Sequence, residues 1–187
     1  MNPTGIQLTL NAYFTSCVRL AKDTVGVLLL KKWRQIEKEN VENINDSMLS
    51  ELLSIQTEGF ENDKRNDIRR FSKKLKKTFY IIKNKDEIVG YCIYYIKPDF
   101  SSSRFNKKAI IYCLGIDKNS RRKGFAEKLL KETIREMKEN NIPFIILYVD
   151  VNNVPAIRLY EKLGFQILRE VKDICGEENC YEMKLKL

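Results

Sequence analysis

Three basic residues stand directly before a glycine in residues 121–126, which read RRKGFA. Gly124 has no side chain and Ala126 has only a methyl group, so a ligand could approach the backbone closely here. A helix that begins at this point directs unpaired backbone N–H groups and the positive end of its dipole at such a ligand. This combination is typical of a pyrophosphate cradle. A solvated basic helix start has the same pattern.

The elements that position this turn are two apolar runs and a helix between them. Residues 109–116 are apolar and fit a buried strand, and the polar residues 117–120 end it. Residues at helical spacing then predict a helix with one face on a sheet: Ala126, Leu129, Leu130, Thr133, Ile134 and Met137. Pro143 ends that helix, and residues 144–151 form a second apolar run. A strand, a helix and a strand of these lengths predict a right-handed βαβ unit with parallel strands.

A second, shorter helix follows the second strand. Asn153 suits its N-cap and Pro155 its first turn, while Gly164 is placed to end it. One face of this helix is apolar and carries Ala156, Leu159, Tyr160 and Leu163. Tyr160 therefore has the spacing of a residue that packs inward.

These two motifs together resemble the GNAT acetyltransferase superfamily. The pattern is Arg-x-x-Gly-x-Ala after a strand, followed by Asn-x-x-Ala-x-x-x-Tyr-x-x-x-Gly-Phe. The layout is similar over about residues 33–187, most specifically over 111–165, and most like the N-terminal protein and ribosomal-protein alanine acetyltransferases. The resemblance implies an α/β fold with a mixed, mostly antiparallel sheet, helices on both faces and a central βαβ unit. It also implies that strands 110–116 and 147–151 splay apart to admit acetyl-coenzyme A.

The resemblance implies transfer of an acetyl group from acetyl-coenzyme A to a primary amine, without a metal. Leu114 and Ile116 are expected to pair their backbone with the pantetheine arm, as an added strand would. The backbone amides of residues 122–127 are expected to hold the pyrophosphate. The full set of expected cofactor-binding residues is Leu114, Ile116, Arg121, Arg122, Lys123, Gly124, Phe125, Ala126, Glu127, Asn153 and Tyr160.

Proton transfer is the next requirement, and Tyr160 stands at the family's general-acid position. A phenol with a pKa of about 10 can donate a proton to a departing thiolate. Packing on the inner face of its helix is the alternative role. Asn153 is the partner position, and a plain N-cap is its alternative.

The general base is less defined, because relatives often carry Glu or His where this chain has Tyr148. A phenol is a poor base unless its pKa is strongly lowered. Tyr112, on the neighbouring strand, could orient a water that carries the proton. Glu61 resembles a glutamate that some relatives use, and a solvated loop acid is its alternative. Asp150 should share the strand face of Tyr148.

The acceptor amine is open to three readings. The expected acceptor is a protein N-terminal α-amine, with ribosome association as a corollary. Asp173 and Ile174 stand where peptide-binding relatives often have adjacent tyrosines, so a small amine or a polyamine is an alternative. The net charge of +9 and the basic stretch 64–77 define the other alternative, an RNA- or ribosome-binding module on a GNAT-like scaffold.

Composition limits the remaining possibilities. The 187 residues, 43% hydrophobic and 32% charged, suit one globular domain. The absence of histidine excludes histidine-dependent triads and histidine metal ligands. Five cysteines without a secretion signal favour reduced thiols and a cytoplasmic location. Cys175 and Cys180 could bridge or bind a metal, but two thiolates alone do not close a zinc site, which favours an unlinked loop pair. No apolar run is long enough to span a membrane.

The rest of the chain is expected to complete the domain. Residues 1–32 are expected to be an N-terminal extension and 33–187 the acetyltransferase domain. The first strand falls either in residues 25–31, inside the extension, or in residues 33–37. Asn45 should cap a helix over about 49–59, and a second helix should include 68–75. The remaining predicted strands are residues 79–83, 88–96, 165–171 and 181–187, with a polar loop over 98–107.

Overall fold

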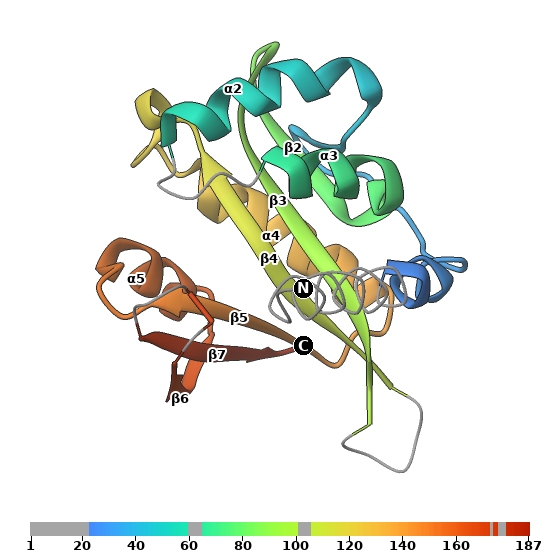
Figure 1. Cartoon of the computed structure of the whole chain (residues 1–187), viewed down its shortest axis with the longest axis vertical. Coiled ribbons are helices and arrows are strands. Elements are labelled where there is room, and N and C mark those ends of the chain that lie inside the picture. The colour runs from blue at the N-terminus through green and yellow to red at the C-terminus, as the bar shows by residue number, and fades with distance from the viewer. Residues whose placement is uncertain (1–22, 60–64, 101–105, 173, 176–178) are drawn as a thin grey trace, which may run out of the picture.

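A single sheet of seven strands organises the chain, for which a computed structural model describes residues 23–59, 65–100, 106–172, 174–175 and 179–187 (Figure 1). The strands are β1 (Val41–Asn43), β2 (Phe79–Asn84), β3 (Glu87–Asp99), β4 (Asn106–Ile116), β5 (Phe144–Asp150), β6 (Gln166–Val171) and β7 (Cys180–Lys186). Their order in the sheet is β1-β2-β3-β4-β5-β7-β6. Neighbours are antiparallel except β4 and β5, which are parallel.

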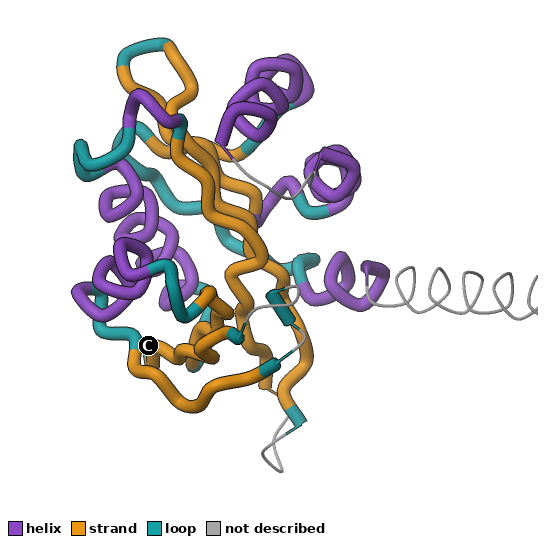
Figure 2. Tube along the Cα trace, turned by 60° about the vertical axis from the view of Figure 1, so that its left-hand side comes forward, coloured by secondary structure: helices purple, strands orange, loops and turns teal. Residues whose placement is uncertain are grey.

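Helices lie on both faces of this sheet. Four of them are α2 (Leu49–Gly59), α3 (Arg65–Lys74), α4 (Phe125–Glu139) and α5 (Val154–Lys162). Helices α2 and α3 cover one face and α4 lies behind the other, with the sheet between the two layers (Figures 1 and 2). The predicted α/β class, the mostly antiparallel sheet and the central βαβ unit are confirmed.

Helix α4 is the crossover of the βαβ unit, and it packs as its spacing predicts. Leu129, Leu130 and Met137 are buried beneath it. The Tyr94 hydroxyl on β3 lies 2.8 Å from the Thr133 hydroxyl on α4, so the helix also makes a polar contact with the sheet. The chain leaves the helix after Glu139 and enters β5 after Pro143.

Most predicted elements match the structure, and one loop is shorter than expected. The predicted loop over 98–107 is wrong at both ends, because β3 runs to Asp99 and β4 starts at Asn106. Pro98 stands opposite Lys107 in this extended pair. The long β3–β4 hairpin tolerates Pro98 because proline can occupy ladder positions where its missing N–H is not needed.

The N-terminal segment differs from both predictions for the first strand. Residues 23–29 are helical and residues 33–38 have no regular structure, so both alternatives are wrong. The first described strand is β1, whose three residues are too few to show an alternating pattern. The division into residues 1–32 and 33–187 stays a prediction, and residues 1–22 lie outside the described part. No helix in the described residues has the length and apolar character needed to cross a membrane.

The cysteines fall into two groups. Cys92 and Cys113 are buried and form no disulfide, as expected for small core residues. Cys175 and Cys180 are joined by a disulfide, so the expectations of reduced thiols and of an unlinked pair are wrong here. The reason is spatial, since the chain brings their Cα atoms to 6.1 Å, within the usual range for a disulfide.

Candidate active site

The parallel strands β4 and β5 stay together over a very short length. They pair at Ala109–Ile145 and Ile110–Ile146. Beyond these pairs β4 continues to Ile116, while β5 continues to Asp150 alongside β7. The two strands therefore diverge toward their carboxyl ends, as the predicted splay requires. In α/β sheets a ligand binds in such a crevice beyond the carboxyl ends of the strands.

The backbone of β4 faces this gap at the two predicted positions. The Asp117 N–H donates to the Val89 carbonyl at 2.9 Å, so Asp117 faces β3. Backbone groups alternate in direction along a strand, which turns those of Ile116 and Leu114 toward the gap. The Ile116 carbonyl also accepts a hydrogen bond from Arg121 Nε at 3.2 Å. The basic turn is thereby tied to the end of the strand.

The helix start is open above Gly124. Gly124 caps α4 with φ of 84°, and Arg122 just before it also has a positive φ, of 63°. A Cβ atom added to Gly124 would meet no heavy atom of the neighbouring structure within 4 Å. The side chains of Arg121, Arg122 and Lys123 are exposed around it, and the part-buried residues that follow are Phe125, Ala126 and Glu127. Free space, first-turn amides and positive charge fit a polyphosphate.

Glu127 serves a different purpose through its side chain. Its carboxylate pairs with Lys131 at 2.8 Å and with Lys162 of α5 at 2.6 Å. Hydrogen bonds from these two lysines lower the pKa of Glu127 to about 2. The carboxylate is therefore ionised at neutral pH and links α4 to α5. Its two lysines offset its charge beside the candidate phosphate cradle, and its backbone N–H belongs to the first turn of α4.

Helix α5 carries Asn153 and Tyr160. The Asn153 amide oxygen accepts a hydrogen bond from the Ala156 N–H at 3.2 Å, so Asn153 is an N-cap. Tyr160 is buried, and its ring packs edge-on against Phe165 with centroids 5.7 Å apart. Burial above all, then the nearby Cys92 and Cys113, raises the pKa of Tyr160. Its hydroxyl carries a proton at neutral pH, as a general acid must.

Tyr148 and Asp150 both lie on β5, where the base was expected. Tyr148 is half-buried and stands opposite Glu182 of β7. Burial and then the Glu182 charge raise the pKa of Tyr148, while Arg169 opposes this shift. A raised pKa keeps Tyr148 a neutral phenol at neutral pH, and a neutral phenol is a poor base. The Asp150 carboxylate accepts a hydrogen bond from the Asn152 N–H at 2.7 Å, in the turn that leads to α5.

Tyr112 contacts a residue, Asp67, that the sequence patterns did not identify as a site residue. Its hydroxyl donates a hydrogen bond to the carboxylate of Asp67 on α3. Burial and then this bond raise the pKa of Tyr112. Asp67 is paired in turn with Arg70 Nη2 at 3.1 Å. The i,i+3 spacing of Asp67 and Arg70 was a visible signal of their pairing, but nothing local linked them to Tyr112. Glu61 lies outside the described residues.

The basic stretch 64–77 is partly neutralised inside the molecule. Lys74 pairs with Asp23 at 3.0 Å, and Lys76 pairs with Asp46 at 2.8 Å. The Lys77 ammonium donates to the Leu30 carbonyl. Fewer free charges therefore remain for a polyanion than the sequence indicates. Among the described residues no group of three or more potential metal ligands comes together.

Several named acetyltransferases are similar in sequence to parts of this chain. It is 41% identical over 56 residues to the mycothiol acetyltransferase of Acidothermus cellulolyticus, which covers 30% of this chain and 17% of that protein. It is 33% identical over 93 residues to the probable spermine N(1)-acetyltransferase of Bacillus subtilis subsp. natto, covering 49% and 60%. It is 31% identical over 121 residues to the N-alpha-acetyltransferase of Sulfurisphaera tokodaii, covering 62% and 72%. The chain thus spans less than two thirds of the first two proteins.

Solved structures share the fold. The ribosomal-protein-S18-alanine N-acetyltransferase of Escherichia coli superposes with a TM-score of 0.65 at 18% identity, over 78% of this chain and 92% of that one. Arabidopsis thaliana NAA60, solved in complex with acetyl-CoA, superposes with a TM-score of 0.68 at 19% identity, over 79% and 98%. The model of the acetyltransferase (GNAT) family matches residues 45–165, which include the diverging strands, the Gly124 helix start and Tyr160. The chain therefore belongs to the acetyltransferase (GNAT) family.

Proposed function

We propose that this protein transfers an acetyl group from acetyl-coenzyme A to a primary amine, and that the amine is the α-amine of a peptide or protein. The observation that carries the proposal is the gap between β4 and β5, which opens beside the Gly124 helix start. Similarity to the archaeal N-alpha-acetyltransferase supports an α-amine acceptor. Acetyl-coenzyme A supplies an activated thioester, whose carbonyl carbon forms the new C–N bond as its C–S bond breaks.

The chain's own residues have three tasks in this reaction. The first-turn amides of α4 and the basic residues before Gly124 bind the phosphates. The backbone groups of Leu114 and Ile116 bind the extended pantetheine arm. Arg121 gives up its hydrogen bond to the Ile116 carbonyl when that carbonyl bonds to the arm. Tyr160 holds a proton on its hydroxyl and donates it to the sulfur that leaves.

The amine must lose a proton as the C–N bond forms. The raised pKa values of Tyr148 and Tyr112 leave both phenols protonated at neutral pH, which suits them to orient a water rather than to act as bases. Because Asp67 accepts the Tyr112 hydroxyl, this pair offers the proton a route toward α3. Glu61 keeps its predicted role as an alternative base.

A small polyamine is the second candidate acceptor, favoured by the similarity to the Bacillus spermine N(1)-acetyltransferase. A panel of acceptors with acetyl-coenzyme A separates the two. We expect peptides with a free α-amine to be acetylated, and the same peptides with a blocked N-terminus and an internal lysine to be poor acceptors. Acetylation of spermine alone would contradict the peptide acceptor.

Cofactor binding gives a direct test at Gly124. Acetyl-coenzyme A should raise the melting temperature of the protein, because a ligand that binds only the folded state stabilises it. Gly124→Leu should abolish this rise at millimolar cofactor, since the side chain fills the space above the helix start. Differential scanning fluorimetry with and without acetyl-coenzyme A measures both effects.

The control for backbone strain is Gly164→Ala. Gly164 has φ of 91°, similar to Gly124, but lies at the end of α5. Both variants lose some stability, because side chains rarely adopt a positive φ. Only Gly124→Leu should lose the cofactor-induced rise. An equal rise in both variants would refute the cradle.

A further inference from the structure

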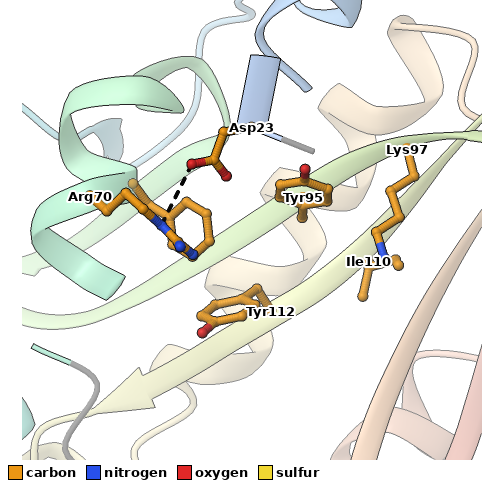
Figure 3. A pocket seen from close by; sticks show the side chains of 7 residues that line it. Asp23, Arg70, Tyr95, Lys97, Ile110 and Tyr112 are labelled. Carbon is orange, nitrogen blue, oxygen red and sulfur yellow. Dashed lines mark ion pairs between the residues drawn. The ribbon is translucent and has the colours of Figure 1, made fainter. Parts of the chain in front are cut away.

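A pocket of about 170 Å³ lies on the face of the sheet that α3 covers (Figure 3). Its walls come from α3 (Arg70 and Phe71), β3 (Tyr95 and Lys97), β4 (Ile110 and Tyr112) and Asp23. The rings of Phe71 and Tyr112 meet edge-on at 4.7 Å and form an apolar wall. The pocket thus combines aromatic rings with charged groups from elements far apart in the sequence.

The pocket lies where the two central strands separate. Ile110 is the last residue of β4 that pairs with β5, and Tyr112 follows it two residues later, beyond the last pair. The Gly124 cradle begins α4, the helix that covers the opposite face. An acceptor that reaches the gap from the α3 face therefore comes past this pocket.

Two polar atoms of the pocket have no hydrogen-bond partner among the described residues, namely the Tyr95 hydroxyl and Arg70 Nε. Tyr95 is only 8% exposed, so its hydroxyl is also cut off from solvent. Arg70 Nε is 3.8 Å from the nearby Asp23 carboxylate, too long for a hydrogen bond. Burial raises the pKa of Tyr95 to about 12, so its hydroxyl carries its proton at neutral pH. Buried polar groups of this kind are normally satisfied, so both atoms call for an external partner.

The charges of the pocket favour an anionic partner. The Asp23 carboxylate is paired with Lys74 at 3.0 Å and faces Arg70, and Asp67 is paired with Arg70. Both carboxylates are therefore offset by cations. The Lys97 ammonium lies 5.5 Å from the centroid of the Tyr95 ring and adds positive charge. Arg70 Nε can only donate a hydrogen bond and the Tyr95 hydroxyl can also donate one, so an oxygen acceptor satisfies both atoms.

We infer that this pocket binds a carboxylate that the acceptor carries close to its reactive amine. The inference rests on the proposed function and narrows its substrate class. The carboxylate accepts hydrogen bonds from Tyr95 and Arg70, while Phe71 and Tyr112 cover the methylene groups that lead to it. An acidic side chain near a peptide N-terminus and the carboxylate of a free amino acid offer the same chemistry.

Matched acceptors test the inference. The peptide pair has the same sequence with Glu or Gln at the second position, and the free pair is glutamate against its diamide. We expect kcat/KM to be roughly 10- to 100-fold higher for the acidic member of the preferred pair, the range for a hydrogen bond to a charged group. The pair that shows this ratio identifies the source of the carboxylate.

Two variants link that ratio to the pocket. Tyr95→Phe removes only the unpartnered hydroxyl, whereas Arg70→Lys keeps the positive charge but removes the whole guanidinium, including Nε and the Nη2 that pairs with Asp67. Both should reduce the acid preference, through KM more than kcat. Tyr95→Phe should unfold no more easily than the wild type, because it leaves no protein group without a partner. Tyr94→Phe is the control, since it removes a hydroxyl that contacts Thr133 and should leave the ratio unchanged.

The outcomes separate the inference from the function on which it rests. Equal rates for the acidic and amide members of both pairs would overturn the inference and leave α-amine acetylation intact. Acetylation of spermine alone would overturn the proposed function. In that case, NMR titration with glutarate and, for comparison, glutaramide still tests whether the pocket binds a carboxylate. Glutarate binding that Tyr95→Phe weakens would show that the pocket binds a carboxylate, although not one carried by the acceptor, and equal or absent binding refutes the carboxylate site itself.

Discussion

Replacing Tyr160 with phenylalanine is expected to lower kcat by roughly 10²–10⁴-fold, the usual contribution of general acid–base catalysis. The thiolate of coenzyme A must gain a proton as it leaves, and the Tyr160 hydroxyl carries one at neutral pH. Steady-state kinetics with the best acceptor of the panel measure the effect.

The affinity of Tyr160→Phe for acetyl-coenzyme A is the control for this prediction. The phenylalanine ring can keep the edge-on contact with Phe165, so the fold and the acetyl-coenzyme A-induced rise in melting temperature should change little. A protein that binds the cofactor normally but turns over slowly has lost a step of the chemistry. Unchanged turnover, with equal or higher stability, would make Tyr160 a core residue and direct attention to Tyr148, Tyr112 and an ordered water.

Local patterns predicted the central part of the fold because its determinants are close in sequence. The α4 stripe repeats every three or four residues, and Asn153 caps a helix whose first turn it contacts directly. The divergence of β4 and β5 is different. Both strands are simple apolar runs, so only the resemblance to a family implied that they splay apart, and the structure shows that their pairing ends after Ile110.

The missed features depend on contacts between distant residues. Tyr112 meets Asp67 across 45 positions, and Lys74 meets Asp23 across 51. No periodicity within one element encodes such contacts, so the pocket beside Tyr95 could not be predicted from the sequence. The unexpected disulfide has a different origin, because Cys175 and Cys180 are only five residues apart and their spacing in the sequence does not show that their Cα atoms lie 6.1 Å apart.

The sequence also did not predict that residues 33–38 would be irregular. One buried acidic residue holds this segment in place. Glu136 of α4 is fully buried and accepts hydrogen bonds from Trp33 Nε1 at 2.8 Å, the Tyr80 hydroxyl at 2.7 Å and the Ile36 N–H at 3.3 Å. The Lys38 ammonium pairs with it at 2.5 Å, and both side chains are almost fully buried. Glu136 thereby holds an irregular segment against the helix, which a search for a strand could not detect.

Glu136→Ala is therefore expected to reduce the free energy of unfolding by about 3–5 kcal/mol, the cost of leaving one partner of a buried ion pair alone. For a chain of this size the loss corresponds to a fall in melting temperature of roughly 6–20 °C. Denaturant titration measures the free energy. Trp33 is the only tryptophan in the sequence, so its fluorescence reports directly on the detached segment. Its emission should shift to longer wavelength in the folded variant.

Two controls separate the buried pair from its surroundings. Glu132→Ala, one turn earlier on α4, removes the more exposed pair with Arg135 and should cost less than about 1 kcal/mol. Glu136→Gln combined with Lys38→Met should recover part of the stability lost by Glu136→Gln alone, because it removes the charge left without a partner. If Glu136→Ala were as stable as Glu132→Ala, with Trp33 emission unchanged, packing and not Glu136 would hold residues 33–38 in place.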